Sequence, residues 1–82
     1  MVIMNIPEIG KTILTNRKSL GLTQKALAER ARVSRYTIVK LENGQASDIQ
    51  FKTLTAVLTE LGLTIDVTER PVSGVTILGQ EP

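Results

Sequence analysis

The sequence predicts a mostly α-helical domain of four to five short helices, followed by a C-terminal β-strand. Apolar residues recur near every 3.6 positions in four stretches between residues 5 and 61, which is the spacing of helices with one buried face. Side chains that favour helix starts and glycines that favour helix ends separate these stretches. Over residues 63–69 the apolar spacing changes to two, which is the pattern of a strand.

The first predicted helix begins near Asn5, carries Pro7 in its first turn and ends at Gly21. Its inward face is formed by four apolar residues, Ile9, Ile13, Leu14 and Leu20. Arg17 lies near the end of this helix, where a cation interacts favourably with the helix dipole. Contact between Arg17 and a DNA phosphate explains its position equally well, so both roles stay open.

Residues 23–44 predict two short helices joined by a tight turn. Thr23 is a good N-cap for the first, over about residues 23–31, because its hydroxyl can accept a hydrogen bond from a first-turn amide. Ser34 offers a second N-cap only three residues beyond that helix, and the second helix runs over about residues 35–43. The apolar positions that face inward are Leu27, Ala28 and Ala31 in the first helix and Ile38 and Leu41 in the second.

The second of these helices exposes an unusual number of polar side chains. With Ile38 and Leu41 facing inward, the outward residues are Arg35, Tyr36, Thr37, Val39 and Lys40. In a helix-turn-helix, the second helix lies in the major groove of DNA and its N-terminal residues contact base edges, while the first helix meets the backbone. Gln24 begins the first helix and is therefore expected to face a phosphate.

Charge is strongly segregated along the chain, although the net charge is only +2. Residues 11–40 contain eight basic residues and one acidic residue, whereas residues 41–82 contain two basic and six acidic residues. A basic half that contains the exposed helix is the pattern expected for contact with phosphates. A solvated charged face is the simpler explanation, but it does not account for the segregation.

The stretch LTQKALAERARVSRYTIVKLENG resembles the phage-repressor (Cro/C1, or XRE) type of helix-turn-helix, with its usual Gln, Leu-Ala, Ser-cap and Leu-Glu-Asn-Gly landmarks. The resemblance covers about residues 7–61. The family often has Gly in the turn where this chain has Arg32, so a non-glycine residue is expected in the left-handed conformation. The alternative is an ordinary helical hairpin without a DNA role, which the two caps and the charge segregation disfavour.

We therefore predict DNA binding by residues of these two helices and by one residue of the helix before them. Arg35 suits guanine through its bidentate fork and Lys40 can do likewise, whereas Tyr36 and Thr37 suit a thymine methyl group or a phosphate. The full predicted set is Arg17, Gln24, Ser34, Arg35, Tyr36, Thr37, Lys40 and Asn43.

A fourth helix is predicted over about residues 50–61 and ends at Gly62, with an apolar stripe of Ile49, Phe51, Leu54, Val57, Leu58 and Leu61. The strand that follows places Leu63, Ile65 and Val67 on one side. It needs a pairing partner, either residues 75–78 of the same chain or the same strand of a second subunit. We favour the second subunit and predict that these three residues form the contact between the two subunits of a dimer.

These predictions divide the chain into three parts: a helix-turn-helix domain over 5–61, a dimerisation strand over 62–70 and a flexible tail over 71–82. Eighty-two residues allow one domain with a small core, which dimerisation would support. The absence of cysteine and histidine excludes disulfides, thiolate or imidazole zinc sites and histidine-dependent catalysis. We expect a cytoplasmic protein that is not an enzyme, without a cofactor, a metal, a membrane span or a signal peptide.

A helical unit followed directly by LGLTIDVTERP is similar to the HipB-like antitoxin branch of the family, over about residues 5–71. The resemblance implies a homodimer that represses its own operon at a palindromic operator and is partnered by a HipA-like serine/threonine kinase toxin. The alternative is a free-standing regulator, such as a prophage repressor or a restriction-modification controller. A protein-interaction module without DNA binding is disfavoured by the exposed Arg35 and Lys40.

Overall fold

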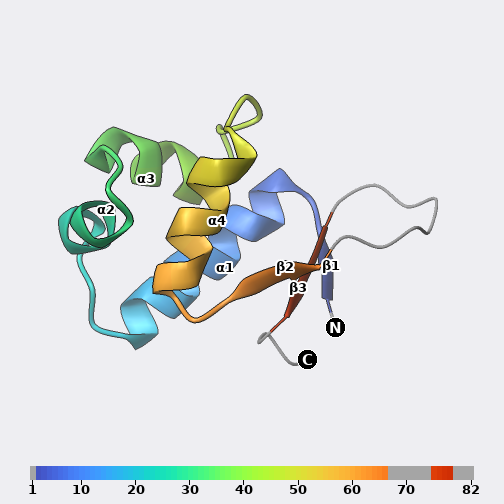
Figure 1. Cartoon of the computed structure of the whole chain (residues 1–82), viewed down its shortest axis with the longest axis horizontal. Helices are drawn as coiled ribbons and strands as arrows, with labels where there is room; N and C mark the ends of the chain where they lie inside the picture. Colours follow the sequence, from blue (N-terminus) through green and yellow to red (C-terminus); the bar gives the residue numbers. More distant parts are fainter. Residues whose placement is uncertain (1, 67–74, 79–82) are drawn as a thin grey trace.

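The computed structural model describes residues 2–66 and 75–78, which form four helices and a three-stranded sheet (Figure 1). The elements in chain order are β1 (Val2–Met4), α1 (Ile6–Ser19), α2 (Gln24–Ala31), α3 (Arg35–Glu42), α4 (Phe51–Glu60), β2 (Thr64–Asp66) and β3 (Val75–Leu78). In Figure 1, α2 and α3 lie at one end of the molecule and the sheet lies at the other. Within these described ranges, every helix is too short or too polar to cross a membrane.

Three helices begin where the sequence predicts, and each start is fixed by a side-chain cap. Asn5, Thr23 and Ser34 each accept a hydrogen bond from the backbone N–H three residues later, at 3.0, 3.0 and 3.1 Å respectively. These bonds satisfy amides that have no partner inside the helix. The helix α4 differs, because its N-cap residue Gln50 makes no side-chain capping bond.

The turn between α2 and α3 contains the predicted departure from ordinary backbone geometry. Arg32 has φ 58° and ψ 44°, in the left-handed region. Within the described ranges, it is the only residue other than glycine with a positive φ. Its N–H donates to the carbonyl groups of Ala28 and Glu29, so the end of α2 is closed by backbone bonds. This confirms that the turn tolerates a residue other than glycine, at the modest cost of a left-handed conformation.

The core lies between the four helices and the start of β2. Its buried apolar residues are Ile9, Ile13, Leu27, Ala28, Ala31, Ile38, Leu41, Ala46, Leu54, Val57, Leu58, Leu61 and Leu63. Two residues that the sequence analysis placed on inward faces are exposed instead: Leu20, 56% exposed, caps α1 and Phe51, 59% exposed, begins α4. Both lie at helix ends, where the apolar period continues but the described elements leave the side chain more than half exposed.

Gly10 allows α1 and α3 to approach each other closely. A Cβ atom built on Gly10 would lie 2.1 Å from the carbonyl oxygen of Leu41, which is far inside van der Waals contact. The backbone of α3 therefore rests directly against α1 at this point. This contact holds α3 in place through its inward face and leaves its other face free.

The strand β2 pairs within the chain, which corrects the predicted partner. The sheet has the order β1-β3-β2, and β3 is antiparallel to both neighbours, with Ile65 opposite Ile77 and Ile3 opposite Thr76. The alternative partner considered from the sequence, residues 75–78, is thus the one observed. The strand at Val75–Leu78 also replaces part of the tail predicted over residues 71–82.

The side chains predicted to form a dimer are partly used by the chain's own core. Leu63 is buried, and Ile65 is half-buried and packs against the same core cluster. Val67, the third predicted dimer residue, lies outside the described residues. A strand after Gly62 is confirmed, but its apolar face covers the end of α4 rather than remaining free for a partner.

Candidate nucleic-acid interface

The helix α3 is anchored on one side and open on the other. Ile38 and Leu41 are almost completely buried, and α3 packs against α1 and α2. On the opposite side, Arg35 and Tyr36 are exposed, with Tyr36 70% exposed despite its aromatic ring. Arg35 and Tyr36 therefore lie on the outer face as expected, because the inward positions are filled by apolar residues, whereas the other three residues predicted to face outward are half-buried.

The first turn of α3 is ordered by hydroxyl groups. Ser34 Oγ accepts from the Thr37 N–H at 3.1 Å and lies 2.9 Å from Thr37 Oγ1. Ser34 thus caps the helix, and Thr37, predicted to contact a base or a phosphate, is half-buried beside it. Both hydroxyls remain at the end of α3 that carries Arg35.

The side chain of Gln24, the first residue of α2, forms hydrogen bonds with two residues of α3. Its Nε2 donates to Glu42 Oε1 at 3.1 Å, and its Oε1 accepts from Arg35 Nη2 at 3.4 Å. Because a carboxylate can only accept, Glu42 determines which end of the Gln24 amide faces Arg35. The residues Arg17, Thr23, Gln24, Lys25 and Arg35 line an open groove of about 460 Å³ at this point.

Arg17 is an internal residue and not part of the outer face. Its Nε and Nη2 donate to the two carboxylate oxygens of Glu42 at 2.6 and 3.1 Å, and its Nη1 donates to the Leu22 carbonyl oxygen at 2.7 Å. Its side chain is only 10% exposed. Arg17 lies in the last turn of α1, as the dipole role requires, and it also forms a buried ion pair that joins α1 to α3. Its contact with a phosphate stays a prediction.

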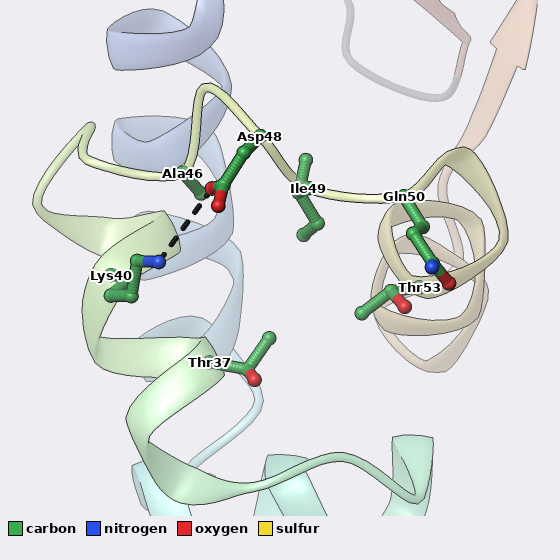
Figure 2. A pocket seen from close by; sticks show the side chains of 7 residues that line it. All are labelled: Thr37, Lys40, Ala46, Asp48, Ile49, Gln50 and Thr53. Atoms are coloured by element: carbon green, nitrogen blue, oxygen red, sulfur yellow. Dashed lines mark ion pairs between the residues drawn. The ribbon is translucent and has the colours of Figure 1, made fainter.

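Lys40 is held beside the connection between α3 and α4. Its Nζ lies 3.6 Å from Asp48 Oδ1 and 5.6 Å from the centre of the Tyr36 ring. These groups stand at a pocket of about 210 Å³ lined by Thr37, Lys40, Ala46, Asp48, Ile49, Gln50 and Thr53. Figure 2 shows Lys40 and Thr37 on α3 facing Gln50 and Thr53 at the start of α4, with Asp48 on the connection between them.

A family model described as helix-turn-helix matches residues 13–67, which include α2, the left-handed turn and α3. The chain belongs to the helix-turn-helix family. Proteins of this family use the second helix of the motif as a recognition helix in the major groove of DNA. In this chain that helix is α3.

Part of the chain is similar in sequence to a named regulator. A protein of Methanothermobacter thermautotrophicus named as an uncharacterized HTH-type transcriptional regulator is 57% identical over 35 residues. That stretch is 43% of this chain and 51% of the relative. The similarity is thus confined to about half the length of the relative.

Two solved structures share this helix-turn-helix fold. The clp gene regulator ClgR from Corynebacterium glutamicum aligns with a TM-score of 0.62 and 30% identity, over 68% of this chain and 58% of that chain. The SinR protein/SinI protein complex gives a TM-score of 0.61 and 28% identity, over 66% of this chain and 52% of that chain. The chain spans little more than half the length of either protein.

Apart from Arg17, the residues predicted to bind DNA separate into two groups along α2 and α3 in this structure. Gln24, Ser34, Arg35, Tyr36 and Thr37 gather where α2 and α3 begin. Lys40 lies further along α3. Asn43, exposed, ends that helix and donates its backbone N–H to the carbonyl oxygen of Val39. An eight-residue helix is about 12 Å long, so Asn43 lies well away from Arg35.

Two acidic residues of the site were missed from the sequence. Glu42 binds Arg17 and orients Gln24, and Asp48 pairs with Lys40. Glu42 belongs to the Leu-Glu-Asn-Gly landmark. This motif indicates where the recognition helix ends, but it does not show which residue the carboxylate of Glu42 binds. The exposed carboxylate of Asp48 carries no sequence signal that distinguishes it from an ordinary loop residue.

Proposed function

We propose that this chain is a sequence-specific transcriptional repressor that binds a palindromic DNA operator as a homodimer. The observation that carries the proposal is the arrangement of Arg35, Tyr36 and Gln24 at the joined starts of α2 and α3. These side chains are exposed or half-buried, and the apolar face of α3 is fixed against the core. The proposal assigns the chain no catalytic activity and no cofactor, and places it in the cytoplasm.

In the proposed complex, α3 lies in the major groove and its first turn faces the bases. Arg35 donates two hydrogen bonds to O6 and N7 of a guanine, because its planar fork matches these two acceptors. Gln24 and the first amides of α2 face a phosphate of the backbone, which fixes the protein on the duplex without selecting a sequence. Tyr36 and Thr37 contact a thymine methyl group or a phosphate.

The proposed dimer uses the open edge of β2. In the sheet order β1-β3-β2, only one edge of β2 is paired by the described strands. Pairing with β2 of a second copy would satisfy that edge and join two three-stranded sheets. A groove of about 190 Å³ runs beside β2, lined by Phe51, Thr55, Leu58, Thr59, Leu63, Thr64 and Ile65, so an apolar surface continues the edge.

The narrower proposal is that the chain is a HipB-like antitoxin with a HipA-like kinase toxin as its partner. It is supported by the strand that follows α4 directly after Gly62, as in the resemblance described above. The structure of SinR in complex with SinI also shows that a protein with this fold can hold a protein partner. A free-standing regulator is the alternative, favoured by the likeness to ClgR, which is named as a regulator of clp genes.

Selection of bound sequences from a random DNA library, using the purified chain, tests the proposed function. We expect enrichment of a palindrome with two half-sites about one helical turn apart. Enrichment of a single half-site would contradict the dimer, and the absence of any enriched sequence would contradict sequence-specific repression. Co-purification with the product of an adjacent kinase-like gene would support the antitoxin role, and a locus without such a gene would favour the free-standing regulator.

A further inference from the structure

We propose that Asp48 competes with DNA for the ammonium group of Lys40 and so limits how tightly the recognition helix binds. The inference deepens the proposed function and rests on it, because it assumes that α3 faces DNA. It concerns the connection between α3 and α4, which carries Asp48.

The competition follows from the contact that Lys40 makes. Its Nζ lies 3.6 Å from Asp48 Oδ1, and Figure 2 shows the two side chains reaching toward each other across one side of the pocket. The Lys40 side chain is 30% exposed, whereas that of Asp48 is 81% exposed. The ammonium group is therefore held near the protein surface by an anion that is itself well solvated and easily replaced.

The ring of Tyr36 also contacts the ammonium group of Lys40. The Lys40 Nζ lies 5.6 Å from the centre of the Tyr36 ring, one turn earlier on α3, which is within the range of a cation–π contact. The Tyr36 ring lies on the exposed face of α3 and carries no carboxylate. The charge that DNA must replace is therefore the carboxylate of Asp48.

Among the described residues, Asp48 is the acidic residue that forms an ion pair with Lys40. Glu42, the acidic residue nearest in sequence on α3, has a side chain that is 4% exposed and binds Arg17 with both oxygens. The ion pairs found within the described ranges join Lys40 to Asp48 and Arg17 to Glu42. A phosphate or base acceptor that draws the Lys40 ammonium group outward would therefore take it away from Asp48.

The size of the effect follows from the exposure of the pair. An exposed ion pair shifts an equilibrium by about 1.5- to fivefold. If this pair breaks on DNA binding, the affinity for DNA is lower by that factor than it would be without Asp48. Removing the charge of Asp48 should therefore tighten binding by about the same factor.

The test compares Asp48→Asn with the wild-type chain on two probes, a random-sequence duplex and the sequence recovered by selection. We expect binding about 1.5- to fivefold tighter for Asp48→Asn and wild-type affinity for Asp48→Glu, which keeps the carboxylate. Glu60→Gln is the matched control, because it also removes one negative charge. Glu60 is the last residue of α4, a ten-residue helix about 15 Å long, and Asp48 precedes the start of that helix. This control should change affinity less. Asp48→Asn should melt slightly below the wild-type chain because it loses the ion pair, whereas Asp48→Glu should melt at the wild-type temperature because it keeps the carboxylate.

A second comparison separates the proposed competition from direct repulsion between Asp48 and DNA. In a Lys40→Met background, Asp48→Asn should no longer tighten binding, because the ammonium group is absent. A gain that persists in this background would show direct repulsion and overturn the inference, as would no gain in the wild-type background. If the wild-type chain binds neither probe, the proposed function itself is contradicted.

Discussion

The guanidinium group of Arg17 binds both carboxylate oxygens of Glu42, with Nε 2.6 Å from Oε2 and Nη2 3.1 Å from Oε1. The pair joins α1 to the last residue of α3, and the two side chains are 10% and 4% exposed. Since Nη1 also binds the Leu22 carbonyl oxygen, most of the donors of Arg17 are used inside the protein. Removal of either partner would leave a buried charge without its counter-ion.

We therefore expect Glu42→Ala to lower the free energy of unfolding by about 3–5 kcal/mol, as for other buried ion pairs that lose one partner. Urea denaturation followed by circular dichroism measures this loss. The double variant Arg17→Met/Glu42→Leu removes both charges and should recover most of the stability. Equal losses in the single and double variants would show that packing, rather than the unpaired charge, sets the cost.

Gly10→Ala should destabilise the chain although alanine is the better helix former. In an exposed helix this change stabilises by about 0.5–1 kcal/mol. Here the added Cβ would meet the Leu41 carbonyl oxygen at 2.1 Å, so α1 and α3 must move apart at a cost of about 1–3 kcal/mol. Thr15→Ala, at an exposed position of the same helix, is the control and should be neutral or stabilising. A rise in stability for Gly10→Ala would contradict the close contact.

Arg35→Ala should weaken binding to the selected operator by about 1–3 kcal/mol, because a bidentate contact to guanine is lost. Binding to random DNA should change much less, and folding should be unaffected because Arg35 is exposed. Fluorescence anisotropy on both duplexes measures the difference. The control Arg30→Ala removes an exposed arginine from the last turn of α2. Equal losses on both duplexes would identify Arg35 as a phosphate contact instead.

Gln24→Ala should lower affinity for operator and random DNA alike, since the residue is expected to contact a phosphate. The structure adds a second possibility to test, because Gln24 also accepts a hydrogen bond from Arg35 at 3.4 Å. Repeating the sequence selection with the variant distinguishes them. An altered base preference at one position would show that Gln24 acts by positioning Arg35, and unchanged binding on both duplexes would exclude either role.

Phe51→Ser should weaken the proposed dimer, because Phe51 lines the groove beside the open edge of β2. Sedimentation velocity at several concentrations would show a larger monomer fraction. Leu20→Ser is a closely matched control, since Leu20 is 56% exposed against 59% for Phe51 but ends α1 outside that groove. A wild-type chain that sediments as a monomer would contradict the dimer, and equal effects of both variants would move the interface elsewhere.

The helices were predictable from the sequence because local chemistry determines their ends. Asn5, Thr23 and Ser34 cap the helices that they were expected to cap, and Gly62 adopts the expected positive φ of 75° after α4. The left-handed conformation of Arg32 followed from its place in the turn. These features depend on residues at most four positions apart, which a single sequence displays directly.

The parts that were not predictable depend on contacts between distant residues. Arg17 and Glu42 are 25 positions apart, and helical periodicity shows neither that Arg17 is buried nor which carboxylate it binds. The three-residue strand β1 is too short to show an alternating pattern, and its partner β3 lies more than 70 positions away. Phe51 follows the apolar period of α4, but only the tertiary arrangement shows that the described elements leave it 59% exposed.

The sheet order also determines when the chain can complete its fold during synthesis. Because β3 lies between β1 and β2, neither of these strands has its neighbour until residues 75–78 have left the ribosome. The four helices all precede residues 75–78 in the chain and can pack first, since domains generally fold as their residues emerge. Val2–Met4, which precedes the other described strands, must therefore wait for its neighbour among them and is ordered among the last.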